Sequence, residues 1–190
     1  MSVEPLAARY NLKQTTLGVE AVISSRKSIF IMLFIPVWLV MWAIGWTSAF
    51  SNLTSADNQT PDLFLMVWIV MWTLGGLWAI SLLLWQLAGR EIIGVEQGVL
   101  QHRVELFGIG RTRKFEGQHI TQLRVVDFSP SFMSQQQAYY PPLFLGKGIG
   151  PLAFDYGAKS MRIGPSFDEA EMRILLSEFY SRLPNNVKSI

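Results

Sequence analysis

The segment from Ile29 to Phe50 reads IFIMLFIPVWLVMWAIGWTSAF, and the segment from Leu63 to Leu87 reads LFLMVWIVMWTLGGLWAISLLLWQL. Neither segment contains an ionisable side chain. The hydrocarbon core of a bilayer takes about 20 consecutive apolar residues to cross as a helix. Because lipid offers the backbone no hydrogen-bond partners, a crossing segment must satisfy its own amides as a helix. We therefore predict a transmembrane helical hairpin over residues 28–89.

The composition agrees with membrane residence. Half of the 190 residues are hydrophobic, only 16% are charged, and the mean hydropathy is +0.27. An ordinary soluble domain carries about a quarter charged residues, and a disordered chain has few apolar ones. The net charge of +2 gives no argument for nucleic acid as a partner. The absence of cysteine excludes disulfides, thiolate metal sites and cysteine nucleophiles.

The basic residues predict how the hairpin is oriented. Four of them (Arg9, Lys13, Arg26 and Lys27) precede the first span, and the remaining 12 Lys and Arg follow the second. The link from Ser51 to Pro61 has none. Since basic residues favour the cytoplasmic side, both termini are predicted to be cytoplasmic. The chain then divides into a cytoplasmic N-terminal segment (1–27), the hairpin (28–89) and a cytoplasmic domain (90–190).

The two spans contain an internal repeat. Residues 37–45, VWLVMWAIG, recur as residues 67–75, VWIVMWTLG, with six of nine positions identical. At about 1.5 Å per residue both copies fall near the middle of the bilayer and run antiparallel. Each copy places two tryptophans and a glycine on one helix face. These candidate membrane-interface residues are Trp38, Trp42 and Gly45 in the first copy, and Trp68, Trp72 and Gly75 in the second.

Two interpretations of this repeat remain open. Tryptophan usually lies at the membrane surface, so four near the midplane require a specific contact. In the first interpretation the indoles fill the groove within the hairpin, where the glycines permit close approach. In the second they face outward and bind other integral membrane subunits, or a bound lipid, quinone or pigment. No cofactor is otherwise predicted, and the uncharged spans argue against a transporter or pump.

The C-terminal part predicts strands followed by one helix. The β-rich runs are residues 91–95, 99–106, 111–115, 119–128, 151–156 and 159–163. Ser166 and Glu169 match a capping box that starts an amphipathic helix, which Pro184 ends. The long loop from Ser129 to Gly150 contains Tyr139, Tyr140, Pro141 and Pro142, a candidate surface for a cytoplasmic partner. The fold class is thus a membrane helical hairpin plus an α+β or all-β domain.

This arrangement resembles the bacterial pleckstrin-homology-like domain proteins that have two N-terminal transmembrane helices. The matching stretches are residues 89–93, 119–124, 154–159 and 164–176. The resemblance implies a bent β-barrel or sandwich capped by the C-terminal helix, in a protein of the bacterial inner membrane. It also implies binding of lipids, peptides or proteins without selecting one of them.

The search for chemistry finds no catalytic or metal-binding motif. His102 and His119 lack further ligands at zinc spacing. Arg111 and Arg113 share a strand face and, with Lys114, form the one basic cluster. They are candidate contacts for anionic lipid headgroups at about 1 kcal/mol each, with an ordinary solvated strand as the alternative. We expect a non-catalytic accessory, structural or assembly subunit of a larger membrane complex, or alternatively a membrane-anchored lipid or peptide sensor.

Overall fold

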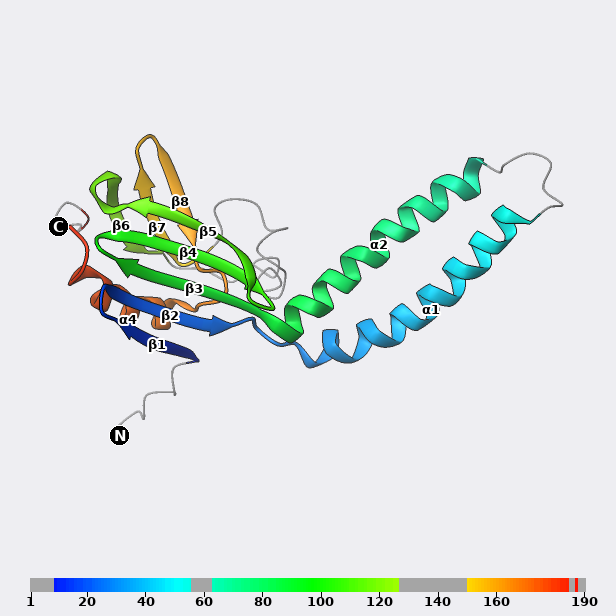
Figure 1. Cartoon of the computed structure of the whole chain (residues 1–190), viewed down its shortest axis with the longest axis horizontal. Coiled ribbons are helices and arrows are strands. Elements are labelled where there is room, and N and C mark those ends of the chain that lie inside the picture. The colour runs from blue at the N-terminus through cyan, green and yellow to red at the C-terminus, as the bar shows by residue number, and fades with distance from the viewer. Residues whose placement is uncertain (1–8, 56–62, 127–149, 185–186, 188–190) are drawn as a thin grey trace. The chain divides into compact units, whose positions relative to one another are not determined.

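The computed structural model describes residues 9–55, 63–126, 150–184 and 187, and the chain forms two compact units (Figure 1). Residues Lys27–Leu87 make one unit, called here the helical hairpin. Residues Met1–Arg26 and Ala88–Ile190 together make the other, called here the β domain. The sequence-based division differs from this grouping, because it set residues 1–27 apart from the C-terminal domain.

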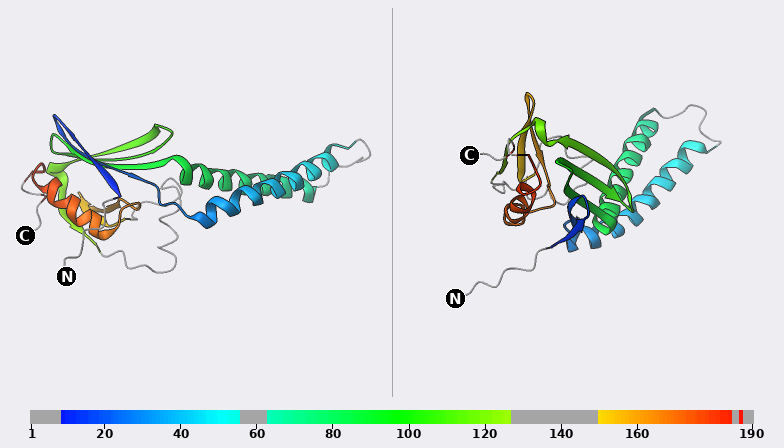
Figure 2. Two further views of the ribbon diagram at one scale, coloured as in Figure 1. Left: turned by 90° about the horizontal axis from the view of Figure 1, so that it is seen from below. Right: turned by 60° about the vertical axis from the view of Figure 1, so that its left-hand side comes forward.

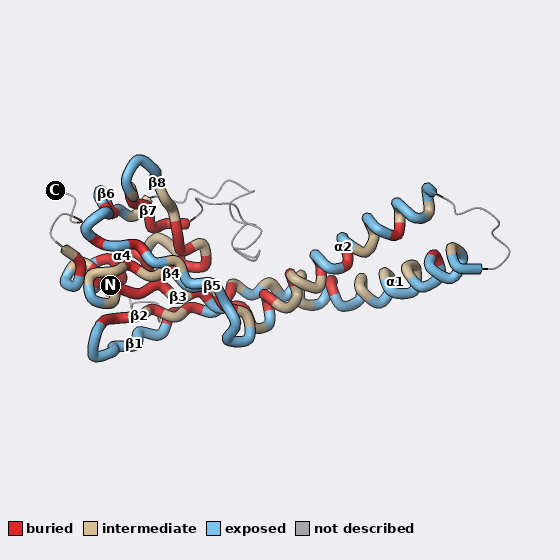
Figure 3. Tube along the Cα trace, turned by 45° about the horizontal axis from the view of Figure 1, so that its top comes forward, coloured by how far each residue is buried: buried red, intermediate tan, exposed pale blue. Residues whose placement is uncertain are grey.

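The helical hairpin consists of two helices of 26 residues, α1 (Ile29–Thr54) and α2 (Leu63–Ala88). Each is about 39 Å long, more than the roughly 30 Å of a hydrocarbon core. Only 6% of the most apolar window of α1 and 17% of that of α2 are buried, whereas the core helix of a soluble domain is mostly buried (Figure 3). The predicted helices are confirmed, and both are long and apolar enough to cross a membrane.

The β domain contains two antiparallel sheets and a C-terminal helix. The first sheet has the order β1 (Tyr10–Thr15), β2 (Gly18–Ser24), β3 (Gly89–Glu96), β4 (Val99–Leu106) and β5 (Ile109–Glu116). After a short 3-10 turn (Gly117–His119), the second has the order β6 (Ile120–Val125), β7 (Leu152–Tyr156) and β8 (Lys159–Ile163). The helix is α4 (Glu169–Tyr180). These elements confirm a helical hairpin plus a β domain, whereas closure into a bent barrel stays a prediction.

The helical hairpin is inserted between two neighbouring strands. Strands β2 and β3 pair along their length, with Ser24 opposite Arg90, although 65 residues separate these two positions. Beyond that pair, Ser25 N donates to Gly89 O at 2.9 Å. Strand β3 begins at Gly89, immediately after α2 ends at Ala88. The β domain therefore fixes both ends of the helical hairpin next to each other.

Both N-terminal strands were missed by the sequence analysis. β1 is polar and exposed after Tyr10, as an edge strand often is. β2 alternates buried Val19, Ala21 and Ile23 with more exposed neighbours, the period of a half-buried strand. β1 pairs with β2, and β2 pairs with β3, which follows the second span. The position of the first two strands before the first span therefore conceals the sheet to which they belong.

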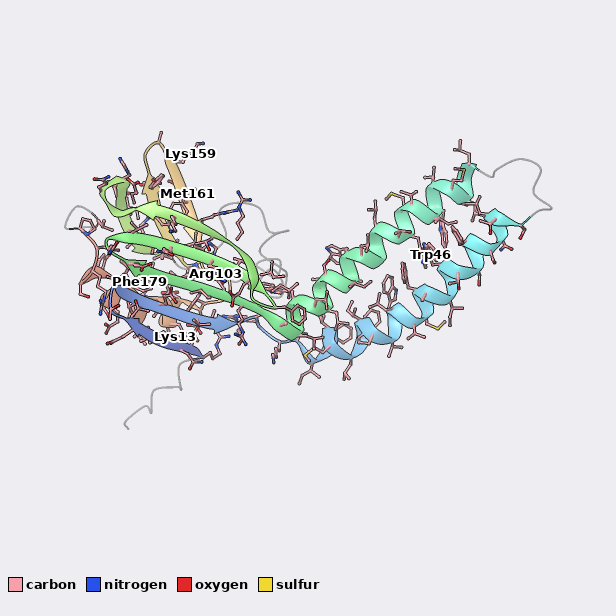
Figure 4. All side chains as sticks on the ribbon, in the orientation of Figure 1. Lys13, Trp46, Arg103, Lys159, Met161 and Phe179 are labelled. Atoms are coloured by element: carbon pink, nitrogen blue, oxygen red, sulfur yellow. The ribbon has the colours of Figure 1, made fainter. Side chains whose placement is uncertain are left out.

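Apolar side chains from both sheets and α4 form one core. Leu100, Ile120 and Phe154 are fully buried, and Phe115 packs edge-on against Phe154 with ring centroids 5.0 Å apart. Helix α4 packs against β2 of the first sheet and β6 of the second (Figure 2). Its buried face, which includes Phe179, therefore contacts both sheets (Figure 4).

The start of α4 differs from the prediction. Asp168, not Ser166, is the N-cap, and its side chain accepts from Glu171 N at 2.8 Å while Glu171 Oε2 accepts from Asp168 N at 3.0 Å. Ser166 lies two residues before this N-cap, and its backbone N donates instead to Glu91 Oε2 at 2.8 Å. Arg9 donates through Nε and Nη2 to both oxygens of Glu171, at 3.0 and 2.8 Å. This fork attaches the N-terminal segment to the C-terminal helix.

The β domain is predicted to fold without its membrane insertion. Replacing residues 27–87 by Asn-Gly retains the β2–β3 pairing, because an Asn-Gly turn suits a two-residue hairpin. We expect a soluble, cooperatively unfolding β protein, measured by circular dichroism and analytical ultracentrifugation. Residues 88–190 alone are the control and should aggregate, since they lose Val19 and Ile23 (about 1.5–3 kcal/mol each) and expose the edge of β3. Equal behaviour of the two variants would contradict the shared domain.

Candidate functional site

The repeated tryptophans meet across the helical hairpin. Trp42 Nε1 donates to the backbone O of Trp72 at 2.9 Å, and Trp72 Nε1 donates back to the O of Trp42 at 3.3 Å. Trp46, which lies between the two helices (Figure 4), donates through Nε1 to Thr73 Oγ1 at 2.8 Å. Trp68 stacks on Trp72, with ring centroids 4.4 Å apart. The reciprocal pair gives each of the two indole N–H groups a backbone carbonyl acceptor on the opposite helix.

The glycines of the repeat have unequal roles. Gly45 lies beneath Trp72, where a Cβ would meet Cζ2 of the indole at 3.8 Å. By symmetry of the repeat, Gly75 should lie beneath Trp42, but a Cβ on Gly75 would meet nothing within 4 Å. Its neighbour Gly76 takes that role, since a Cβ there would lie 2.2 Å from Trp42 Cζ2. Gly76 is therefore the position that permits the close approach predicted for Gly75.

These contacts favour the first interpretation of the repeat for most of its residues. Trp42, Trp72 and Gly45 face the groove within the hairpin, and Trp38 and Trp68 are half-buried. Gly75 faces outward and is exposed. Sequence reasoning missed Trp46 and Thr73, whose hydrogen bond joins the helices beside the repeat. The i, i+4 spacing from Trp42 to Trp46 was the available signal.

The basic residues of the predicted cluster lie on β5, the edge strand of the first sheet. Arg111 is opposite Val104 and Arg113 is opposite His102, which confirms that the two arginines share one face. Lys114 lies on the other face of the strand. Arg111 and Lys114 are exposed and Arg113 is half-buried, and none of the three forms an ion pair with any residue that the structure describes.

A buried carboxylate lies in the same sheet and was not predicted. Glu91 on β3 is fully buried, and its Oε1 lies 2.6 Å from Nε2 of His102, whose side chain is 8% exposed. Its Oε2 accepts from Ser166 N at 2.8 Å. Glu105, a buried acidic residue of β4, pairs with Arg103 at 2.9 Å. Glu91 thus ties β3, β4 and the segment before α4 together in the interior.

The remaining surfaces present little that could carry chemistry. Among residues 9–55, 63–126, 150–184 and 187, no group of three or more His, Cys, Asp or Glu is placed to hold a metal ion. A groove between β6 and α4 is lined by Tyr180 and by two arginines, Arg124 and Arg173, which are paired with Asp155 and Glu169. The candidate partner loop with Tyr139, Tyr140, Pro141 and Pro142 lies outside the described residues.

No protein-family model matches the chain, and a search of curated proteins also finds no match. Function must therefore be argued from the helical hairpin and the β domain themselves.

The two adjacent glycines of α2 should respond oppositely to the same substitution. Gly76→Ala forces Trp42 out of the hairpin groove and breaks its bond to Trp72, so we expect a loss of about 1–3 kcal/mol. Gly75→Ala meets open space and should be neutral or slightly stabilising. SDS titration of the purified full chain, followed by tryptophan emission, measures both. Equal destabilisation would contradict the assignment of Gly76.

The buried Glu91–His102 pair should stabilise the β domain far more than the exposed Glu116–His119 pair. Glu91→Ala leaves Ser166 N–H and His102 without their buried partner, at a cost of about 3–5 kcal/mol. Glu116→Ala removes a contact between two side chains that are each 58% exposed, which is worth about 0–1 kcal/mol. Hydrogen exchange of the strand amides under increasing urea separates the two, and similar losses would contradict a structural role for Glu91.

Proposed function

We propose that the chain is a non-catalytic accessory or assembly subunit of a larger integral membrane complex in the bacterial inner membrane. The observation that carries the proposal is the notch at Gly75 on the outward face of α2. Met71, Gly75 and Trp78 share one helix face at i, i+4 and i+7 spacing, and both flanking side chains are exposed. The notch lies near the middle of the predicted span.

The notch suits a transmembrane helix of another subunit. Helices associate in lipid through close backbone approach at small residues, because lipid gives no hydrophobic driving force between them. Gly76 already serves the packing of α2 on α1, so an adjacent Gly75 is not needed for the hairpin itself. A helix interior glycine costs roughly 0.5–1 kcal/mol relative to alanine. An outward glycine beside a large aromatic side chain is therefore more readily explained by a partner than by folding.

The β domain would lie on the cytoplasmic side, as a pleckstrin-homology-like module that covers a surface of the complex. Both ends of the helical hairpin continue into paired strands of one domain, which supports a common side for the two termini. The bias of Lys and Arg towards that side supports the cytoplasm. The Tyr139–Pro142 loop is our candidate for its contact with the partner.

The proposal predicts that filling the notch releases the partner. The chain is extracted from its native membrane in mild detergent, and its mass is measured by native mass spectrometry. We expect the unmodified chain to carry another integral membrane subunit at fixed stoichiometry. Gly75→Leu should lose that subunit while keeping the SDS resistance of the hairpin, because the added atoms point away from α1.

Val70→Phe is the matched control, since it also enlarges an exposed side chain of α2. It lies about 140° around the helix from Gly75 and should retain the subunit. A chain that runs only as a monomer, without any stoichiometric subunit, would overturn the proposed function.

A further inference from the structure

The turn between β4 and β5 exposes two large apolar side chains. Phe107 is 66% exposed and Ile109 is 83% exposed, more than any other large hydrophobic residue that the structure describes in the β domain. They flank Gly108 at the tip of a two-residue turn. Neither contributes to the core, so burial in the β domain does not account for either side chain.

The backbone at the tip is an unfavourable place for phenylalanine. Phe107 and Gly108 have φ values of +53° and +82°, the left-handed pair that this type of turn requires. The β3–β4 turn uses the same geometry with Gln97 and Gly98, at +49° and +77°. Asn, Asp and Gly suit such positions, whereas a bulky residue there is a genuine outlier. A side chain that is both strained and exposed points to a function for the tip.

The register of the first sheet shows which end carries this tip. Leu106, next to Phe107, is the cross-strand partner of Gly89, and also of Ile109. Gly89 is bonded to Ala88, the last residue of α2. Directly paired Cα atoms in antiparallel strands are about 4.5–5.5 Å apart. Phe107 is thus one strand spacing from the point where the chain leaves its second apolar helix.

Positive charge follows the apolar tip along β5. At about 3.4 Å per residue, Arg111 lies roughly 7 Å from Ile109 along the strand, Arg113 roughly 14 Å and Lys114 roughly 17 Å. Arg103, on the neighbouring strand, is already paired with Glu105. In a bilayer the acyl chains lie deeper than the lipid phosphates. A turn with apolar residues at its tip and basic residues farther along the strand therefore suits an anionic bilayer surface, because the apolar side chains reach the acyl chains while the cations reach the phosphates.

We propose that the β4–β5 turn docks on the surface of the bilayer that the helical hairpin spans. Phe107 and Ile109 enter the interfacial layer, and Arg111 and Arg113 bind the phosphates of anionic lipids, with Lys114 adding a weaker, more distant attraction. The occupant is lipid rather than a protein because the tip lies beside the end of a membrane-crossing helix. This contact requires no other subunit and is therefore independent of the proposed complex.

The absence of cysteine permits a direct test on the full chain. Ile109→Cys carries an environment-sensitive NBD fluorophore, and the protein is reconstituted in nanodiscs of phosphatidylglycerol and phosphatidylcholine. Nitroxide-labelled lipid should quench the fluorophore at position 109, and aqueous iodide should quench it several-fold less than free dye. The same fluorophore at Gln97→Cys, on the exposed turn at the other end of β4, is the control and should be open to iodide.

Two further variants of the labelled protein separate the apolar from the charged contribution. Phe107→Asn suits the left-handed backbone, so the fold is kept or stabilised while lipid quenching falls. Charge reversal of Arg111 and Arg113 should lower lipid quenching more than Lys114→Glu, and 1 M salt should reproduce that loss, because the Debye length falls to about 3 Å.

Equal iodide access at positions 109 and 97 would overturn the docking of the tip. Unchanged lipid quenching in pure phosphatidylcholine would overturn the assignment of the arginines to anionic headgroups. Both results are distinguishable from failure of the proposed complex, because these nanodiscs contain no other protein.

Discussion

The pairing of β2 with β3 is the constraint on which the rest of the structure depends. It places residues on either side of a two-helix insertion directly opposite each other, with Ser24 facing Arg90. A strand pair fixes its two chains about 5 Å apart, so the ends of α1 and α2 cannot separate while the sheet is intact. The contacts between the helices then form within a closed loop, which lowers the entropy cost of bringing them together. The hydrophobic core of the β domain in this way supports packing in the helical hairpin.

Within the hairpin, the need of each indole N–H for a hydrogen-bond acceptor determines which residues of the repeat face the other helix. An indole buried in hydrocarbon needs an acceptor for its N–H. A backbone carbonyl of the opposite helix can supply that acceptor without placing a charge in the span. Trp42 and Trp72 solve this reciprocally, each donating to the other's carbonyl. Both residues occupy the same position in the two copies of the repeat, and the copies run antiparallel. The same residue in each copy therefore makes the same hydrogen bond to the other helix. Trp78, an exposed tryptophan of α2, lies outside the repeat.

The sequence predicts well what depends on local periodicity and poorly what depends on distant partners. The two spans follow from uncharged runs of sufficient length. The bounds of β8 were predicted to the residue, because Gly157 marks the turn before it. Strand β2 was missed because its partner β3 lies beyond the insertion, and β1 was missed with it because β1 pairs only with β2 among the strands of its sheet. The sequence predicted Gly75, not Gly76, as the position of close approach. The spacing shows only that Gly75 shares a helix face with Trp68 and Trp72, and it does not show how α2 is rotated about its own axis relative to α1. The N-cap is Asp168 because Asp168 and Glu171 form a capping box of their own, two residues beyond the predicted one.

The turns at the two ends of the first sheet have the same backbone geometry but place different kinds of residue in the left-handed position. At the β3–β4 turn a polar residue occupies the left-handed position, and Pro184 packs over Gly98 and Gly117. At the opposite end Phe107 is strained and exposed. A strained backbone conformation costs stability, and natural proteins retain such features mainly at functional sites. The strained residue lies at the end of the sheet where β3 follows α2, which argues that this end serves something other than folding.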